Sequence, residues 1–301
     1  MATTAGSCRY RQPSSSPPTA PSSRATSIPT SVYEWKSTRL STRCTALGPI
    51  VRKGMGDFVE DACTMTDPSP LEEAFRKICA TEAPLSERLA LLTAAVERHG
   101  QPFAVAYQTL IDQLKGAAAG GTAPAVGEQL PPFLLPDHTG HLVGLDELLA
   151  KGPLVVSFNR GHWCEYCELE LRAFAQAHAD LAARGVQVVS IMPERGEYTR
   201  KVRALTHDTV TVLSDIDNGY ALAVGIVMWL GENVQALYRK FGIDIERYQG
   251  NGAWFVPIPA TFVLDRQGRI LARKVDPDFR SRMDIEEILD TLEVAEGEPQ
   301  R

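Results

Sequence analysis

The sequence has few cysteines, no long apolar run and no excess of basic residues. Six cysteines in 301 residues are too few for a disulfide-stapled secreted scaffold, so we expect a cytoplasmic protein, with organelle import as the less favoured alternative. The longest apolar run, residues 220–230, is about half of the roughly 20 residues that a membrane-spanning helix needs. It predicts a core helix or a buried turn, and no membrane partner. A net charge of −6 argues against nucleic acid as a partner.

Residues 1–64 lack a periodic apolar pattern. The first fifty residues contain 10 Ser, 8 Thr and 6 Pro, and such a segment cannot bury enough surface to offset its ordering entropy. We therefore expect a disordered extension. It is rich in Ser and Arg and poor in acidic residues, which resembles an organelle transit peptide. We favour the alternative that Met65 begins the functional chain, because the residues after it lead directly into a helix start.

Residues 65–115 carry three amphipathic helical patterns. Ser69 and Glu72 form a capping box with Pro70 at the first helical position, which predicts a helix start. Two further stripes of apolar residues follow Pro84 and Pro102. We expect a helical module for packing or dimerisation, with a substrate-specific cap as the alternative. The Gly- and Ala-rich residues 116–125 predict a flexible linker.

Residues 126–293 alternate between strand and helix patterns. Strands are expected at residues 154–158, 186–192, 210–213, 260–264 and 270–274. Apolar residues spaced four apart (Leu169, Ala173, Ala177 and Leu181) predict a helix between the first two strands, and residues 283–292 predict a final helix. A βαβ unit followed by ββα is the order of a thioredoxin-like α/β fold. Residues 294–301 form a tail without a core pattern.

Cys164 and Cys167 lie three residues apart, between the first expected strand and its helix. At a helix start, unpaired backbone N–H groups and the helix dipole stabilise a thiolate, which is the reactive form of cysteine. Arg160 and His162 add nearby positive potential. Structural zinc needs about four ligands, and the sequence has neither a second Cys-x-x-Cys nor a close His pair. We therefore expect a redox-active dithiol without a metal or cofactor, in preference to a zinc site or two inert core residues.

The segments "VGEQLPPFLLPDHTGHLVGLDELL" and "IPATFVLDRQGRI" resemble the opening and the last two strands of the alkyl hydroperoxide reductase and thiol-specific antioxidant family, the peroxiredoxins. The resemblance spans about residues 126–292. It implies a thioredoxin-like fold and antioxidant thiol chemistry.

The resemblance also implies roles for individual residues. Peroxiredoxins carry a Pro-x-x-x-Thr-x-x-Cys loop, and here Cys167 occupies the peroxide-attacking position, Cys164 the threonine position and Arg160 the proline position. The loop thus departs from the family at two positions. Pro259 falls where thioredoxins keep a cis-proline against their dithiol, and Trp163 is expected to pack over the dithiol or to form a docking surface. Arg160, Trp163 and Pro259 are the candidate substrate-binding residues.

The favoured function is hydroperoxide reduction. Cys167 would attack the peroxide, Cys164 would close a disulfide, and thioredoxin or a glutaredoxin-type reductant would reduce it. One alternative is a protein disulfide reductase in which Cys164 attacks. Another is a non-catalytic redox-sensing or interaction protein. A homodimer is a further possibility. Arg280 and Arg282 are expected to be surface charges, with a role in anion binding or at an interface as the alternative.

Overall fold

Three helices open the part of the chain that the computed structural model describes, residues 68–297. Helix α2 (Pro70–Cys79) begins as predicted, with Ser69 Oγ accepting a hydrogen bond from the Glu72 backbone N at 3.2 Å. It is followed by α3 (Leu85–His99) and α4 (Gln101–Gly116). The predicted stripes are the faces that these helices bury, which confirms the helical module. The expectations for residues 1–64 lie outside the described residues.

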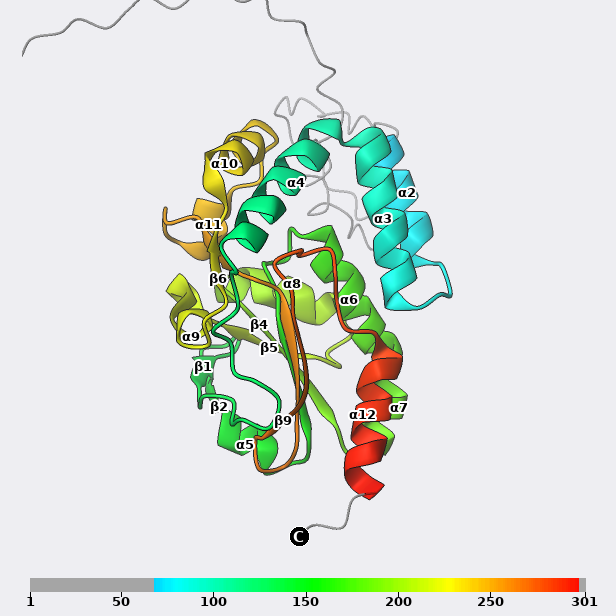
Figure 1. Ribbon diagram of the computed structural model, residues 1–301, viewed down its shortest axis with the longest axis vertical. Coiled ribbons are helices and arrows are strands. Elements are labelled where there is room, and N and C mark those ends of the chain that lie inside the picture. Colours follow the sequence, from blue (N-terminus) through cyan, green and yellow to red (C-terminus); the bar gives the residue numbers. More distant parts are fainter. Residues whose placement is uncertain (1–67, 298–301) are drawn as a thin grey trace, which may run out of the picture. The chain divides into compact units, whose positions relative to one another are not determined.

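The central sheet has five strands in the order β5-β4-β3-β8-β9 (Figure 1). Strands β3 (Leu154–Phe158), β4 (Gln187–Met192) and β5 (Thr211–Ser214) are parallel. Strands β8 (Ala260–Leu264) and β9 (Ile270–Val275) form the predicted hairpin and run antiparallel to their neighbours. This sheet order, with a helical connection between β3 and β4, confirms the thioredoxin-like fold.

The sheet is buried on both faces. Alternate side chains of β3 enter two separate apolar cores, with Val156 in one and Val155 in the other, because successive strand residues point to opposite faces. Helix α12 (Ile285–Gly297) packs Ile288 and Leu292 into the second core. The expected tail therefore begins later than predicted, since residues 294–297 continue this helix.

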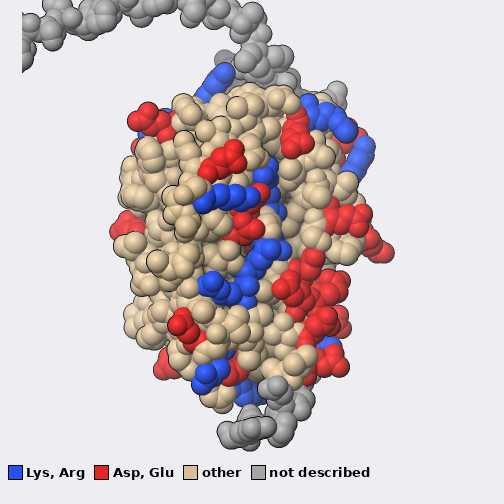
Figure 2. Space-filling view, viewed as in Figure 1, with Lys and Arg blue, Asp and Glu red and all other residues tan. Residues whose placement is uncertain are grey.

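Acidic side chains gather over α12 in Figure 2, whereas Lys and Arg run through the middle of the view.

The apolar stripe from Leu169 to Leu181, predicted as one helix, forms two helices, α6 (Glu165–Gln176) and α7 (His178–Ala183).

The apolar run at residues 220–230 also differs from the expected core helix or buried turn. It forms the short helix α9 (Gly219–Ala223) and then strand β6 (Val227–Trp229), which pairs with β7 (Phe255–Pro257). Val227, Met228 and Trp229 alternate between the core and solvent, and so short an alternation gives a weak signal.

Several shorter elements carry no clear pattern in the sequence. They are β1 (Leu134–Pro136), β2 (Leu142–Gly144), α5 (Leu145–Leu149), α8 (Gly196–Leu205), the 3-10 turn η2 (Ile216–Asn218), α10 (Gly231–Lys240) and α11 (Ile245–Gln249). Helix α10 packs against α4 of the helical module. Helices α2 and α3 of the same module pack against α6. The helical module therefore adjoins the helix that follows the cysteine pair. Within residues 68–297, no helix is long and apolar enough to cross a membrane.

The segment between the helical module and β1 differs from the flexible linker that its composition predicts. Arg273 Nη1, from β9, donates hydrogen bonds to the carbonyl oxygens of Ala123 at 2.6 Å and Pro124 at 2.7 Å. The Gly127 backbone N donates to the Ile270 carbonyl at 2.8 Å. Gly120 adopts φ +80°, and a Cβ there would lie 2.9 Å from Val275 Cγ1. Long-range contacts with β9 hold this segment, and local composition does not reveal them.

Removing the Arg273 guanidinium should loosen this segment. Since hydrogen bonds from a charged donor contribute about 1.5–3 kcal/mol each, Arg273→Ala should lower the free energy of unfolding by about 2 kcal/mol or more. It should also speed proteinase K cleavage within residues 117–127. Lys274→Ala, the next residue on β9, is the matched control. Equal cleavage rates in the two variants would show that these hydrogen bonds do not order the segment.

Candidate active site

The cysteine pair lies where the sequence places it, between a buried strand and a helix. Strand β3 ends at Phe158, and Cys164 is the N-cap of α6, with its Sγ accepting a hydrogen bond from the Cys167 backbone N at 3.3 Å. The two Sγ atoms are 2.8 Å apart, and Cys167 donates to Cys164. Both residues are almost completely buried, with exposed fractions of 1% and 0%. The pair is therefore preorganised for disulfide formation but covered from solvent.

Arg160 is the nearest cation to Cys164. Its Nη2 donates to Cys164 Sγ at 3.0 Å, and its Cζ lies 3.8 Å from the centroid of the Phe279 ring. Among the described residues, its Nε and Nη1 have no hydrogen-bond partner, and no carboxylate lies within ion-pair distance of it. A buried charge is costly unless it is paired. A thiolate at Cys164 supplies the counter-charge that Arg160 otherwise lacks.

A second arginine lies beside Cys167, and the sequence did not predict it. Arg282 is 6% exposed, which overturns the expectation of a surface charge. Its Nη2 lies 3.6 Å from Cys167 Sγ, and its Nε donates to Glu170 Oε2 at 3.2 Å. The other oxygen of Glu170 accepts from Thr261 Oγ1 at 3.1 Å. Arg282 thus already has a carboxylate partner, whereas Arg280 is partly exposed and pairs with Asp278 at 2.7 Å.

The two thiols have opposite pKa shifts. Burial alone would raise the pKa of Cys164, but the hydrogen bond from Cys167 and the positive charges of Arg160 and Arg282 lower it to about 6. Burial, the hydrogen bond to Cys164 and the neighbouring charge of that thiolate raise the pKa of Cys167 well above its usual range. Two sulfurs this close do not both ionise, so the pair carries one negative charge, mainly on Cys164.

Trp163 is buried in the protein interior, beside Arg160. It is 4% exposed, and its ring lies 5.3 Å from Arg160 Cζ and 5.2 Å from the Tyr238 ring. Burial excludes the docking surface that was one expectation for Trp163. Together with Tyr107 from α4 and Phe279 from the loop after β9, it surrounds the Arg160 guanidinium. Sequence spacing did not indicate Tyr107, Tyr238 or Phe279, because each comes from a separate element.

His162 pairs with a buried carboxylate, and Pro259 has a trans peptide bond. His162 pairs with the buried Glu194 through Nδ1 at 2.7 Å, and its backbone N donates to the same carboxylate at 2.8 Å. His162 therefore anchors the loop to Glu194, two residues after the end of β4. Pro259 is buried between β7 and β8, beside the end of β3 where Phe158 pairs with Ala260. No cis peptide bond occurs in the described residues, so Pro259 is not the cis-proline that thioredoxins keep at this position.

Within residues 68–297, no group of three or more His, Cys, Asp and Glu side chains is arranged to hold a metal ion. The geometry instead presents two sulfurs, one ionised, between two buried arginines. Such a pair can attack an electrophilic oxygen or sulfur atom and then close a disulfide.

Comparison with known proteins agrees with the resemblance found in the sequence. Residues 126–273 match the model of the AhpC/TSA family. Among solved structures, peroxidoxin BcpB from Mycobacterium tuberculosis is 21% identical, with a TM-score of 0.44 over 56% of this chain and 96% of that one. Reduced Prx3 from Vibrio vulnificus is 19% identical, with a TM-score of 0.45 over 56% and 99%. A search of curated proteins gave no significant match. The chain therefore carries a peroxiredoxin-like domain of the AhpC/TSA family with a thioredoxin fold.

Proposed function

We propose that this protein is a thiol-dependent peroxidase in which Cys164 is the attacking thiolate and Cys167 the resolving thiol. The observation that carries the proposal is the position of Cys164 Sγ at the N-cap of α6, 3.0 Å from Arg160 Nη2. Helix N-termini and neighbouring cations both stabilise a thiolate. The family of the domain supports peroxide as the substrate.

The first step is attack by the Cys164 thiolate on the terminal oxygen of a hydroperoxide. An S–O bond forms and the O–O bond breaks, with both of its electrons leaving on the alkoxide. The alkoxide takes up a proton and departs as an alcohol, or as water when the substrate is hydrogen peroxide. The sulfur is oxidised by two electrons to a sulfenic acid. Arg160 holds the thiolate before attack and donates hydrogen bonds to the developing charge.

The second step closes the disulfide. Cys167 Sγ, 2.8 Å away, attacks the sulfenic sulfur. An S–S bond forms, the S–O bond breaks, and hydroxide leaves with the Cys167 proton as water. An external dithiol of the thioredoxin or glutaredoxin type then supplies two electrons and two protons, which returns both thiols.

The resemblance and the electrostatics name different sulfurs as the attacking one. The family loop aligns its peroxide-attacking cysteine with Cys167, while the helix start and Arg160 favour a thiolate at Cys164. We follow the electrostatics, because Arg282, the cation beside Cys167, is already paired with Glu170. The assignment of Cys167 from the resemblance remains the competing prediction.

A protein disulfide reductase is the second candidate. A low-pKa first cysteine at a helix start, followed by a buried second cysteine, also suits attack on a disulfide sulfur. Turnover of hydrogen peroxide and tert-butyl hydroperoxide with thioredoxin recycling tests the first candidate, and insulin reduction tests the second. Fast peroxide turnover with slow insulin reduction would support the peroxidase. The reverse result would replace it with the reductase.

Thiol reactivity should depend on pH in a way that identifies the ionised sulfur. With the pKa of Cys164 at about 6, alkylation by iodoacetamide should rise with a midpoint near pH 6 and level off above about pH 7. An unperturbed cysteine has its midpoint near about pH 8.5. Stopped-flow alkylation, with peptide mapping of the labelled residue, measures this profile. A midpoint above pH 8, or first labelling at Cys167, would contradict a resting thiolate at Cys164.

A further inference from the structure

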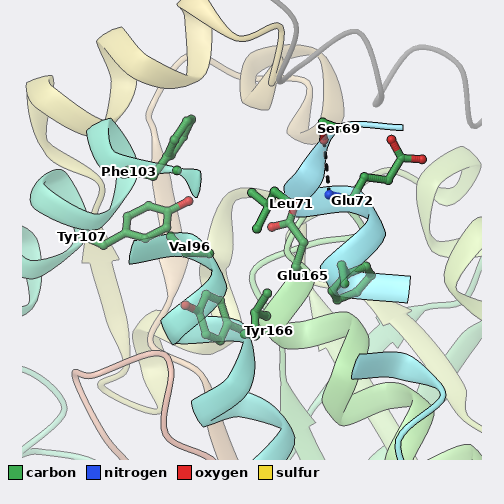
Figure 3. A pocket seen from close by; sticks show the side chains of 11 residues that line it. Ser69, Leu71, Glu72, Val96, Phe103, Tyr107, Glu165 and Tyr166 are labelled. Atoms are coloured by element: carbon green, nitrogen blue, oxygen red, sulfur yellow. Dashed lines mark hydrogen bonds between the residues drawn. The ribbon is translucent and has the colours of Figure 1, made fainter. Parts of the chain in front are cut away.

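A pocket lies between the helical module and the start of α6. Side chains from α2, α3, α4 and α6 converge on it (Figure 3). The cavity measures about 40 Å³ and is partly open to solvent. A single water molecule needs about 10–15 Å³, so the cavity accommodates a group of about three or four heavy atoms.

The wall of this pocket is apolar. It is formed by Leu71, Phe75, Leu92, Val96 and Phe103. Phe75, Leu92 and Phe103 are at most 3% exposed, so the core holds them in place. The pocket thus offers an apolar group a site in which it leaves water without distorting the protein.

The charged residues of the pocket are two glutamates. Glu72 and Glu165 are partly exposed, and Ser69 uses its hydroxyl to cap α2. Glu72 Oε1 lies 3.7 Å from Arg76 Nη2, so this carboxylate already has a cationic partner. The apolar wall therefore determines which group the pocket favours.

The pocket adjoins the dithiol. Two of its lining residues, Glu165 and Tyr166, directly follow Cys164. A third, Tyr107, donates or accepts a hydrogen bond with Tyr238 OH at 3.1 Å, and its ring lies 5.9 Å from Arg160 Cζ. Aromatic side chains thus separate the pocket from the arginine that contacts the thiolate. Because both sulfurs are buried, this cover must move for a substrate to reach them.

We infer that the helical module binds the apolar group of a small organic hydroperoxide in this pocket and so sets the substrate preference of the dithiol. The inference deepens the proposed function and rests on it. The apolar wall comes from residues 71–103, which lie outside the family match at residues 126–273. Hydrogen peroxide has no apolar group and gains nothing from the pocket.

Filling the pocket should change selectivity without changing the chemistry. Val96→Phe should lower kcat/KM for tert-butyl hydroperoxide about 10-fold, since a few methyl groups in an apolar site carry about this discrimination. It should leave kcat/KM for hydrogen peroxide within 2-fold. The matched control is Val105→Phe on α4, a position that is 63% exposed and does not line the pocket. Equal losses for both peroxides, or no loss for either, would overturn the inference.

A second variant covers the case in which Val96→Phe does not fold. Leu71→Ala enlarges the pocket and should raise the ratio of kcat/KM for cumene hydroperoxide over tert-butyl hydroperoxide about 3-fold or more. An unchanged ratio in Leu71→Ala would contradict the pocket as the substrate site.

Binding of an unreactive ligand separates failure of the pocket from failure of the proposed function. Ligand-detected NMR should show tert-butanol binding to the wild type and to Val105→Phe, with a loss of the signal in Val96→Phe. If no hydroperoxide is turned over but tert-butanol binds in this way, the peroxidase proposal fails and the apolar site stands. If the wild type turns over hydroperoxides but does not bind tert-butanol, the pocket inference fails alone.

Discussion

Cys164→Ser should lower the rate of the peroxide reaction by more than about 100-fold, because it removes the sulfur that is ionised at neutral pH. Cys167→Ser should retain the first step, since the N-cap position and the Arg160 contact of Cys164 are unchanged. Its sulfenic acid should then persist, because the resolving thiol is absent. Stopped-flow peroxide consumption and dimedone labelling, located by peptide mapping, measure both effects.

The opposite labelling pattern would favour the assignment that the family resemblance implies. Without Cys164, Cys167 loses the hydrogen bond and the neighbouring charge that raise its pKa, and Arg282 lies 3.6 Å from its sulfur. A Cys164→Ser protein that consumes peroxide at the wild-type rate and carries dimedone on Cys167 would therefore reverse the two roles. Cys79→Ser is the control for a cysteine away from the pair and should leave both steps unchanged.

The parts of the fold that the sequence predicted are those with strong local signals. Strands β3 and β8 match their predicted ranges because each is a short apolar run that is completely buried. The start of α2 followed from Ser69 and Pro70. Strands β6 and β7 have three residues each and pair across 25 residues or more of intervening sequence, so neither has a pattern of its own.

The site was predicted only where its residues are adjacent in sequence. Cys164, Cys167 and Arg160 lie within one loop and helix start, and their proximity follows from local geometry. Arg282, by contrast, reaches Cys167 across 115 positions, and its segment resembles an exposed turn. Tyr107 comes from the helical module. Sequence patterns predict the helices of this module but not the surface on which they pack. Tertiary packing decides these contacts, and one sequence alone does not show it.

The oxidised protein should be less stable than the reduced protein, which is the reverse of the usual effect of a disulfide. Closing a loop as short as Cys164–Cys167 contributes only about 2 kcal/mol in the chain-entropy model. Oxidation also removes the thiolate that balances Arg160, which is 1% exposed. Breaking a buried ion pair from one side costs about 3–5 kcal/mol, so at about pH 9, above the pKa of an unfolded cysteine, the free energy of unfolding should fall by about 1–3 kcal/mol on oxidation. Urea unfolding of both forms, with the bond verified by peptide mapping, measures the difference.

Arg160→Met tests the cause of this destabilisation. Without the buried charge, oxidation leaves nothing uncompensated, so the disulfide form should become the more stable one. Arg172→Met is the matched control, because Arg172 pairs with Glu168 on α6 and is 35% exposed. In this variant, as in the wild type, the oxidised form should be less stable than the reduced form. An oxidised wild type that is more stable than the reduced form would show that Arg160 finds another partner once the thiolate is gone.

The difference in stability between the reduced and oxidised forms should depend on pH, because Cys164 ionises only in the reduced form. Its pKa in the folded protein, about 6, lies below the ordinary cysteine value of about 8.5, so ionisation stabilises the reduced fold. For an acidic group whose pKa is lowered on folding, this stabilisation is complete above the pKa of the group in the unfolded chain. It is lost as the pH falls through the pKa of the group in the folded protein. The advantage of the reduced form should therefore grow from about pH 6 toward pH 9 and disappear below pH 6. The disulfide carries no ionisable sulfur, so a gap that does not change between pH 5 and pH 8 would rule out the thiolate of Cys164 as its source.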